Sequence, residues 1–491
     1  MVGLSACWHI PASFPLSEKL FAVIFMDDST RIGMKALTDP KCVAVIGASA
    51  DPNKVGFGVL KSLIEGCVFK SYNCSAFAGS VYPVNPRQSE ILGRKCYSRV
   101  QDVPEAVDLA VIAVPSASVK QVISDCAEKK VKAAVIISAG FAETGPEGRI
   151  LQDEIIALAR QNGIRILGPN VLGILRPRIS LNASFALSMP EAGGIAFISQ
   201  SGALADSVVD WALEARYSFS LLVSLGNSAD LDVSDFLEFC LEDPNTRAIT
   251  LYLEGIRDGR KFLKVASAVT KIKPIILLKG GKSARGEKAI ASHTGSLAGS
   301  YAVYEAAMRQ AGVFMAESVE DLFDLAKALS EQPRVNGKNV AIVTNGGGVG
   351  VLTADYCEMH GLNVVEFNPQ TISKLESSGK MHPAYSRANP LDLVGDALPE
   401  RYEAALDILL QEDSIDGIIV VQTLQTMTRS KEDAQVVIAA HKKFPKKPIV
   451  CVFMGGKYSA EGVTVLRQNG IPDYNDPLKA VKVMKVLCGV V

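Results

Sequence analysis

Short apolar runs rich in β-branched residues alternate with longer amphipathic stretches in three successive segments of this chain. Such alternation is typical of parallel β-α-β units, in which a helix follows each strand. Strands are expected at residues 43–46, 80–84, 109–114, 133–138, 164–167, 195–199, 219–224, 248–253, 274–278, 340–344, 364–367, 417–421 and 449–453. The sequence therefore predicts an α/β protein with three consecutive doubly wound parallel-sheet domains.

Polar stretches between the segments set the expected domain boundaries. At 491 residues the chain has room for about three domains. The stretch at residues 331–338 contains Pro333 and Gly337 among polar residues and is expected to be a linker. We expect an N-terminal extension of uncertain order, two domains, the linker and a third domain, in that order, at residues 1–33, 34–190, 191–330, 331–338 and 339–491.

The composition argues against several classes of function. A formal net charge of −1 does not suit a nucleic-acid binder, which carries a clustered basic excess. No apolar run reaches the roughly 18–20 residues of a membrane span, so no membrane association is expected. The ten cysteines include no C-x-x-C pair. They are interpreted as reduced core residues of a cytoplasmic protein rather than disulfides or metal ligands, and no metal site is expected on this chain.

Turns with backbone donors and cations follow the expected strands of the first domain. The loop after residue 46 has the shape of a dinucleotide-binding turn but lacks G-x-G-x-x-G. The second strand ends in the basic residue Arg87, and no clear acidic residue lies there to hold a ribose. A cation suits a phosphorylated ribose or a pyrophosphate, so the pattern favours a phosphate-bearing nucleotide other than NAD. Any one turn could be an ordinary βα turn, but several along one sheet edge favour a ligand cleft.

The second domain combines an anion-type turn with a carboxylate at a strand end. The strand at 195–199 runs into Ser-Gln-Ser-Gly at residues 199–202, where hydroxyls and glycine at a helix start can bind an anion. A plain helix N-cap explains this motif equally well. Glu254 follows the strand at 248–253 and is a candidate to accept a hydrogen bond from an imidazole, which would fix its tautomer. The alternative for Glu254 is a cap or an ion pair.

His293 is one of only five histidines and lies among small and hydroxyl residues, after a Gly/Lys-rich loop at residues 279–283. Small residues let an anion approach the backbone, and a helix is expected to start near Thr294 and to aim its N–H groups at that anion. A neutral imidazole in such surroundings can attack phosphorus and carry the phosphoryl group. The alternative is a loop histidine that only hydrogen-bonds its neighbours.

Taken together, these motifs resemble the α subunit of the ADP-forming acetyl-CoA synthetases, within the wider family of NDP-forming acyl-CoA synthetases that includes succinyl-CoA ligase. The resemblance covers residues 41–491 and rests on the order of six motifs: Gly-Ala-Ser with Lys-Val-Gly (47–56), Val-Asn-Pro-Arg (84–87), Gly-Pro-Asn (168–170), Ser-Gln-Ser-Gly (199–202), Leu-Glu-Gly (253–255) and Ser-His-Thr-Gly (292–295). It implies a Rossmann-like domain that binds coenzyme A, followed by two flavodoxin-like domains.

The resemblance also implies roles for individual residues. His293 is expected to be the phosphorylated histidine and Glu254 the glutamate that supports it. The expected phosphate-binding residues are Ser199, Gln200, Ser201, Gly202 and Ala203. The expected coenzyme A contacts are Gly47, Ala48, Ser49, Lys54, Val55, Gly56, Arg87, Val114, Pro115, Ser138, Ala139 and Gly140.

The implied reaction converts acyl-CoA, ADP and phosphate into a carboxylic acid, coenzyme A and ATP, through an acyl phosphate and a phosphohistidine. No segment shows the antiparallel sheets of an ATP-grasp domain, so ADP or ATP with Mg²⁺ is expected mainly on a separate ATP-grasp β subunit, typically in an α2β2 heterotetramer. One alternative is a non-catalytic coenzyme A-binding regulatory module, a class that often lacks the histidine. Another is an NAD-dependent dehydrogenase, which needs a glycine motif and an acidic ribose partner that are absent here.

Overall fold

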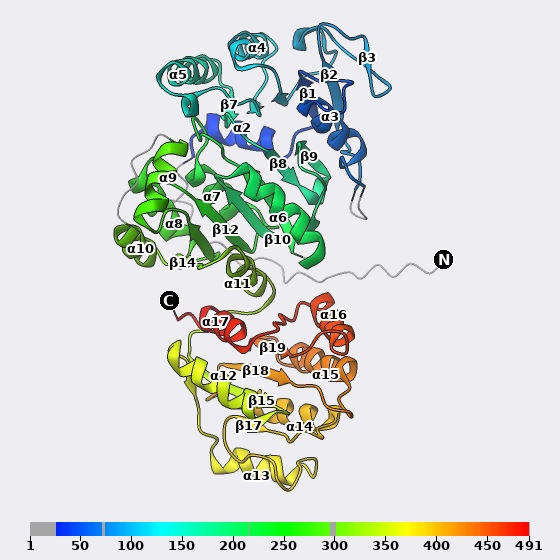
Figure 1. Cartoon of the computed structure of the whole chain (residues 1–491), viewed down its shortest axis with the longest axis vertical. Coiled ribbons are helices and arrows are strands. Elements are labelled where there is room, and N and C mark those ends of the chain that lie inside the picture. Colours follow the sequence, from blue (N-terminus) through cyan, green and yellow to red (C-terminus); the bar gives the residue numbers. More distant parts are fainter. Residues whose placement is uncertain (1–25, 71–73, 216, 295–300, 491) are drawn as a thin grey trace.

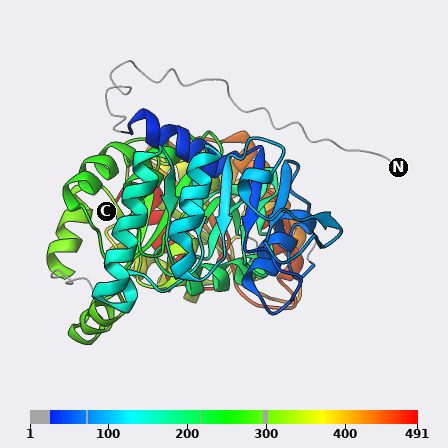
Figure 2. The ribbon, with the colours of Figure 1, turned by 90° about the horizontal axis from the view of Figure 1, so that it is seen from above.

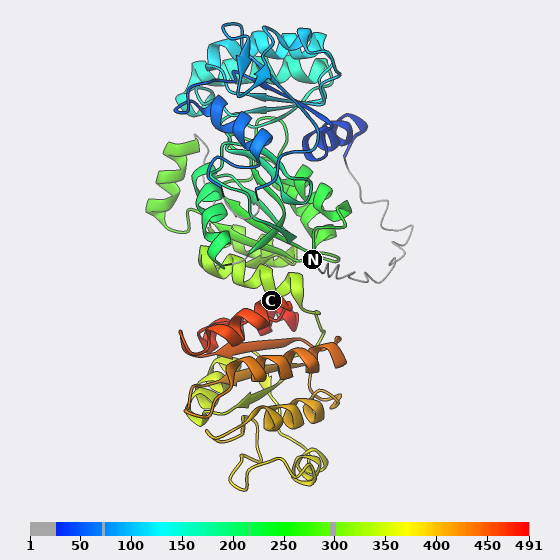
Figure 3. The same ribbon diagram turned by 90° about the vertical axis from the view of Figure 1, so that its right-hand side faces the viewer.

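The computed structural model describes residues 26–70, 74–215, 217–294 and 301–490, with the backbone alone for residues 291–294. Three α/β units follow one another along the long axis of the molecule, in sequence order from blue to red (Figures 1 and 3). Each unit is built around its own largely parallel sheet. The prediction of three consecutive α/β domains with parallel sheets is therefore confirmed.

The first sheet has the strand order β2-β1-β5-β6-β7, and all of its pairings are parallel. Its strands are β1 (Cys42–Ile46), β2 (Ser80–Val84), β5 (Leu109–Ile112), β6 (Ala133–Ile136) and β7 (Arg165–Leu167). Around it lie α2 (Asp28–Thr38), α3 (Val55–Glu65), α4 (Ser116–Glu128), α5 (Pro146–Gln161), the short strands β3 (Glu90–Ile91) and β4 (Arg94–Lys95), and the 3-10 turns η1 (Val100–Asp102) and η2 (Ala142–Thr144). Helices α4 and α5 lie side by side over this sheet (Figure 2).

The second sheet has seven strands in the order β14-β13-β12-β10-β11-β8-β9. They are β8 (Gly173–Arg176), β9 (Leu181–Ser184), β10 (Glu191–Ser199), β11 (Ser218–Ser224), β12 (Ala248–Leu253), β13 (Ile275–Lys279) and β14 (Phe314–Met315). The associated helices are α6 (Gly202–Ala215), α7 (Val233–Glu242), α8 (Gly259–Val269), α9 (Ala284–Thr294), α10 (Tyr301–Gln310) and α11 (Val319–Glu331), and the 3-10 turn η3 (Pro177–Ile179) joins β8 to β9.

The third sheet has the strand order β16-β15-β18-β19, and β17 pairs with the end of β15. Its strands are β15 (Asn339–Thr344), β16 (Asn363–Val364), β17 (Leu391–Asp392), β18 (Gly417–Gln422) and β19 (Ile449–Phe453). Its helices are α12 (Gly347–Met359), α13 (Pro369–Ser377), α14 (Pro399–Leu409), α15 (Ser430–Lys443), α16 (Ala460–Gln468) and α17 (Pro477–Leu487). Helix α17 packs against α11 and so joins the third unit to the second (Figure 1).

Burial explains why the strands could be located from the sequence. Strands β1, β5, β6, β13 and β19 are buried along their whole length. Parallel strands that are covered on both faces are expected to be continuous apolar runs. The five strands named here are short runs of this kind and are rich in β-branched residues. Sheets of this kind bind ligands at the carboxyl ends of their strands, beside the point where the strand order reverses.

Two short stretches depart from the expected organisation. Strands β8 and β9, which were not predicted, pair antiparallel with each other and extend the second sheet through β11, although they precede residue 190. Helix α2 begins at Asp28, inside the expected extension, and packs against β6 and β7 of the first sheet. Both stretches were assigned by their place in the sequence, whereas tertiary pairing decides where they belong.

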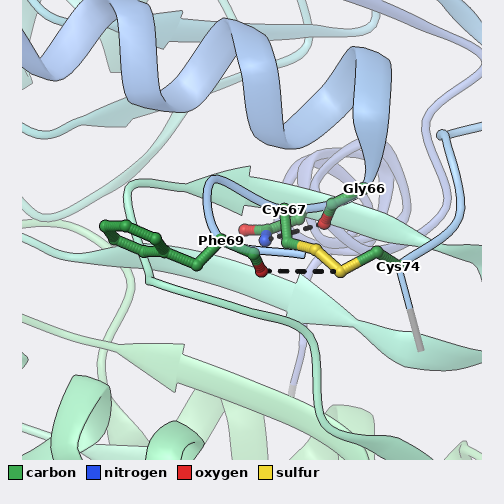
Figure 4. Close-up of a disulfide and its surroundings, with 5 residues drawn as sticks. Gly66, Cys67, Phe69 and Cys74 are labelled. Atoms are coloured by element: carbon green, nitrogen blue, oxygen red, sulfur yellow. Dashed lines mark hydrogen bonds between the residues drawn. A yellow bond between two sulfur atoms is a disulfide. The ribbon is translucent and has the colours of Figure 1, made fainter. Parts of the chain in front are cut away.

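The interpretation of the cysteines was wrong for one pair. Cys67 and Cys74 form a disulfide between the end of α3 and the start of the segment that leads to β2 (Figure 4). Their Cα atoms are 5.6 Å apart, a separation at which two cysteines can be bridged. Seven other cysteines in the described part of the chain are free and buried. A seven-residue separation matches no short cysteine motif, so sequence spacing did not reveal this bridge.

Neither a membrane-spanning helix nor a metal-binding cluster is found in the part of the chain that the structure describes. No helix there is long and apolar enough to cross a bilayer. No group of three or more His, Cys, Asp or Glu side chains there gathers at a distance that could hold a metal ion.

Candidate active site

Two glycines at and after the end of β1 lie where a side chain would not fit. Gly47 has a φ of +89°, and a Cβ on it would press against the carbonyl group of Ala113. A Cβ on Gly56, in the first turn of α3, would collide with the carbonyl oxygen of Gly47. Asn85 ties the loop after β1 to the end of β2, because its amide donates to the Ala48 carbonyl at 2.8 Å. The two strand ends therefore form one rigid edge beside the point where the strand order of the first sheet reverses.

This edge presents two exposed cations. The side chains of Lys54 and Arg87 are exposed, and neither pairs with a carboxylate among the residues that the structure describes. Val55, in the first turn of α3, is also 42% exposed. Unpaired cations next to an apolar side chain and a tight glycine turn fit a ligand that carries both phosphates and an organic chain, as coenzyme A does.

The ends of β5 and β6 continue this edge toward the second domain. The Ser138 hydroxyl donates to the Val114 carbonyl and joins the two turns. Pro115 and Ala139 are exposed. The backbone N–H of Gly140, one of the expected coenzyme A contacts, donates to the Glu143 carboxylate at 2.6 Å. The following 3-10 turn η2 thus folds its own carboxylate back onto this turn, and the coenzyme A contact of Gly140 stays a prediction.

In the second domain, Gln200 links the anion-type turn to the strand end that carries Glu254. Its side-chain oxygen accepts from the backbone N–H groups of Glu254, at 2.6 Å, and Gly255, at 3.0 Å. Its amide donates to the Gly255 carbonyl at 2.9 Å. The side chain of Gln200, expected to bind phosphate, therefore acts on the neighbouring strand end. The two turns lie at the reversal point of the second sheet, between β10 and β12.

The serines of this turn stabilise the start of α6. The Ser199 hydroxyl, which is fully buried, accepts from the Ser201 N–H at 3.1 Å and donates to the Ser201 carbonyl at 2.8 Å. The Ser201 hydroxyl accepts from the Leu204 N–H at 3.2 Å, which is an N-cap contact. Ala203 is exposed in the first turn. The N-cap alternative is thus correct for Ser201, while the remaining N–H groups of the first turn keep the polarity that attracts an anion.

Glu254 has Tyr252 and Lys279 as polar neighbours. Glu254 is buried, and burial together with the Glu254 carboxylate raises the pKa of the Tyr252 hydroxyl. The Lys279 ammonium donates to the Glu254 carbonyl at 2.8 Å. Burial lowers the pKa of Lys279, while Glu254 and Glu287 act in the opposite direction. The Glu254 side chain therefore lies beside the Tyr252 hydroxyl in a place that solvent hardly reaches.

His293 belongs to α9, which follows the Gly/Lys-rich loop after β13. The helix begins at Ala284, so the expectation of a helix start near Thr294 is wrong. The reason is that residues 284–291, apart from Gly286, are mostly good helix formers, and that the Ser283 hydroxyl accepts from the Gly286 N–H at 3.1 Å and so caps the start of the helix. The side chain of His293 lies outside the described residues, and its predicted role is therefore untested by geometry.

The two domains meet at these strand ends through the interdomain loop, residues 226–230, which follows β11. The backbone N–H groups of Asn227 and Ala229 donate to the carbonyls of Pro169 and Gly168, each at 3.0 Å. Arg257, which lies three residues beyond Glu254, donates to the Ala229 carbonyl at 2.7 Å. The interdomain loop therefore connects the end of the first sheet with the strand end that carries Glu254. No sequence pattern pointed to this loop, because its partners lie far away in the chain.

Comparison with known proteins agrees with this arrangement. Models of a CoA binding domain, a succinyl-CoA ligase like flavodoxin domain and a ligase-CoA domain match residues 41–177, 192–329 and 340–488. The α subunit of ADP-forming acetate–CoA ligase I from Pyrococcus furiosus is 42% identical over 93% of this chain and 97% of its own length. The chain belongs to the ADP-forming acetate–CoA ligase family.

Other members of this family differ in length or are known as structures. ADP-forming acetate–CoA ligase I from Archaeoglobus fulgidus is 44% identical over 92% of this chain, but this chain spans only 63% of that protein. The solved structure of dinucleotide forming acetyl-coenzyme A synthetase 1 from Ca. Korarchaeum cryptofilum, in complex with phosphate and ADP, is 39% identical with a TM-score of 0.87, and the match covers 94% of this chain and 97% of that one. The family resemblance that the motifs indicated is therefore confirmed.

Proposed function

We propose that this chain is the α subunit of an ADP-forming acyl-CoA synthetase, an acid–thiol ligase for which acetate is the default acid. The reaction is acyl-CoA with ADP and phosphate going to a carboxylic acid, coenzyme A and ATP. The observation that carries the proposal is the Gln200 bridge, which fixes the backbone of the strand end at Glu254 beside the anion-type turn, at the reversal point of the second sheet. The names of relatives that match this chain along nearly their whole length support it.

The first step takes place between the first two domains. Acyl-CoA lies along the carboxyl edge of the first sheet, with its phosphates near Lys54 and Arg87. A phosphate oxygen attacks the thioester carbonyl, the carbon–sulfur bond breaks, and the thiolate leaves and takes up a proton. The helix start at residues 199–203 stabilises the phosphate through its N–H groups and its dipole. Catalysis here is mainly the placement of two reactants and the neutralisation of oxyanions.

The second and third steps transfer the phosphoryl group. A ring nitrogen of His293 attacks the phosphorus of the acyl phosphate, and the bond from phosphorus to the acyl oxygen breaks to release the carboxylate. Glu254 accepts a hydrogen bond from the other ring nitrogen and stabilises the charged ring. The terminal phosphate oxygen of ADP then attacks the phosphohistidine, and the phosphorus–nitrogen bond breaks. We assign Mg²⁺ and ADP to an ATP-grasp β subunit, in an α2β2 heterotetramer in the cytoplasm.

Replacing Glu254 with Gln tests the proposed role of the carboxylate. We expect Glu254→Gln, purified with the partner subunit, to form ATP from acetyl-CoA, ADP and phosphate at least about tenfold more slowly than the wild type, because the histidine loses the group that sets its tautomer. Glu154→Gln, which changes a half-exposed carboxylate paired with Lys120 on the outer helices, serves as the matched control. Wild-type turnover in Glu254→Gln removes this role, and coenzyme A binding without any turnover by the wild type favours a regulatory module instead.

A further inference from the structure

Glu143 is a carboxylate that neither the motifs nor the proposed chemistry uses, yet it joins the two domains. It lies in η2, the 3-10 turn between β6 and α5. One of its oxygens accepts from the backbone N–H groups of Gly140, at 2.6 Å, and Phe141, at 3.1 Å. The other oxygen accepts from the side-chain amide of Asn227 at 2.6 Å. The first oxygen thus holds the strand end of the first domain, and the second holds the interdomain loop of the second domain.

These contacts keep Glu143 ionised despite its partial burial. Burial raises the pKa of its carboxyl group, but the hydrogen bonds from Asn227, Gly140 and Phe141 outweigh burial and leave the pKa below its usual value. A charged acceptor with three N–H donors forms stronger hydrogen bonds than a neutral one. The bridge between the domains therefore consists of strong, charge-assisted hydrogen bonds.

Asn227 is held as firmly on its own side. Its amide also donates to the Gln152 oxygen at 3.0 Å, so both of its side-chain hydrogens have acceptors. Its backbone N–H donates to the Pro169 carbonyl at 3.0 Å. The neighbouring Gly226 approaches Asn170 so closely that a Cβ on it would collide with the Asn170 carbonyl. The interdomain loop thus has almost no freedom to shift along the edge of the first sheet.

The position of η2 gives this bridge a functional meaning. The turn starts two residues after Gly140, the last of the expected coenzyme A contacts. On its other side it lies beside α9, the helix whose backbone includes His293. The interdomain loop in turn contacts Arg257, close to Glu254. Glu143 and Asn227 therefore stand where the thioester end of the first domain must be aligned with the phosphate site of the second.

We propose that Glu143 and Asn227 are a positioning pair that sets the alignment of the coenzyme A domain against the phosphate site. The pair touches neither reacting group. It fixes the distance between the strand end at Gly140 and the interdomain loop, and so controls the attack of phosphate on the thioester. This inference rests on the proposed function for its kinetic consequence, whereas the bridge itself can be tested without any activity.

A polarity exchange tests the pair, and its double variant keeps the net charge of the wild type. In Glu143→Gln the oxygen of the new amide still accepts from Gly140 and Phe141, but its NH₂ group faces the NH₂ group of Asn227. In Asn227→Asp two carboxylates face each other. In the double variant the amide introduced at position 143 donates to the carboxylate introduced at position 227, and Gln152 turns its own amide to donate as well. The double variant thus rebuilds the bridge in the opposite direction.

We expect each single variant, measured with the partner subunit, to lower kcat for ATP formation from acetyl-CoA by roughly 10- to 100-fold, because a displacement on the order of 1 Å is enough to misalign two reactants. The dissociation constant for coenzyme A, measured by calorimetry, should stay within about twofold of the wild type, since the cations and the glycine turn are untouched. The double variant should recover at least about tenfold of the lost kcat, while Glu154→Gln should match the wild type.

Two results overturn the inference. One is a double variant whose kcat is no higher than that of the less active single variant. The other is a loss of coenzyme A affinity in the single variants as large as the loss of kcat, which would make Glu143 part of the ligand site. A wild type without acyl-CoA-dependent ATP formation contradicts the proposed function instead. In that case the melting temperatures of the four proteins still decide the bridge: recovery in the double variant supports it, and additive losses refute it.

Discussion

The two junctions between the domains differ in whether their buried charged groups have partners. Between the first and second domains, Asp230 of the interdomain loop has a fully buried side chain and is fully paired. It accepts from Arg160 at 2.7 Å, from Arg165 at 2.9 and 3.0 Å, and from the Ile166 backbone N–H at 2.8 Å. The Arg165 guanidinium also contacts Thr30 of α2, so the N-terminal helix is part of this junction.

Between the second and third domains, buried titratable groups lack such partners. Burial raises the pKa of Glu331, and one of its oxygens has no hydrogen-bond partner among the described residues. Burial lowers the pKa of Lys327. Burial also raises the pKa of Asp473 to about 7, although the Phe453 N–H donates to its carboxylate at 3.0 Å. Apolar contacts between α11 and α17 hold this junction together.

The difference indicates that the two junctions have different functions. Directional polar contacts fix one geometry, and the first junction is where the strand ends that carry the proposed chemistry meet. Apolar packing holds two bodies together with less directional demand, and none of the residues named for the second junction takes part in the proposed chemistry. We therefore expect the first junction to be sensitive to single polar substitutions, and the second to respond mainly to pH.

The largest effect is expected at Asp230. Asp230→Ala leaves the Arg165 guanidinium and the Ile166 N–H without their acceptor in a buried place, so we expect a loss of about 3–5 kcal/mol in the free energy of unfolding. Urea unfolding of the purified protein, followed by circular dichroism, measures it. Glu154→Gln, which breaks the half-exposed pair with Lys120, should cost less than about 1 kcal/mol. Equal losses in the two variants would mean that Asp230 contributes no more than a half-exposed ion pair, and would contradict the claim that polar contacts fix the first junction.

The second effect is a pH dependence that arises from Asp473. Because its folded pKa is about 7 and lies above the ordinary value of 3.8, the folded protein keeps a proton that the unfolded chain releases. The associated stability is fully present below about pH 4 and is lost as the pH rises through about 7. Asp473→Asn cannot ionise, so its advantage over the wild type should grow between pH 5 and 8, to on the order of 2 kcal/mol.

Melting temperatures of the two proteins at several pH values test this expectation. The amide oxygen introduced by Asp473→Asn still accepts from the Phe453 N–H, so the variant keeps the contact that the carboxylate makes. If the melting temperatures of the two proteins change with pH in parallel across this range, Asp473 does not control the second junction.

The smallest effect is expected for the ion pairs at the rim of the second junction. Lys482 pairs with Glu317, but the Glu317 side chain is 74% exposed and solvent screens the interaction. Lys482→Ala should change the free energy of unfolding by less than about 1 kcal/mol, and the change should shrink further in about 1 M salt. A loss comparable to that of Asp230→Ala would mean that charge, and not apolar packing, joins the second and third domains.

The strands and the strand-end motifs were predictable because they depend on local patterns. Buried parallel strands are short apolar runs, and Glu254 follows one of them directly. The features that the sequence did not reveal depend on partners far apart in the chain. Glu143 and Asn227 are 84 residues apart, and Ile166 and Asp230 are 64 apart. Strands β8 and β9 were missed for the same reason, since their sheet is decided by pairing with β11.

Gln200 shows how a motif can be found in the sequence while the contacts of one of its side chains are not. The Ser-Gln-Ser-Gly pattern correctly located a turn before a helix. It did not indicate that the Gln200 side chain binds the backbone of the adjacent strand end, because that contact joins residues 54 and 55 positions apart. A pattern identifies the residue types at a site, whereas the fold decides which of them face a ligand and which orient a neighbour.

Transfer of radioactive phosphate to the chain in the presence of acetyl-CoA tests the role of His293 most directly. The wild-type protein should become labelled, whereas His293→Ala should take up no label while it binds coenzyme A as the wild type does. His382→Ala, which changes a loop histidine of the third domain that accepts from the Ala384 N–H at 3.0 Å, should be labelled normally. Labelling that persists in His293→Ala would contradict the central claim that this imidazole carries the phosphoryl group.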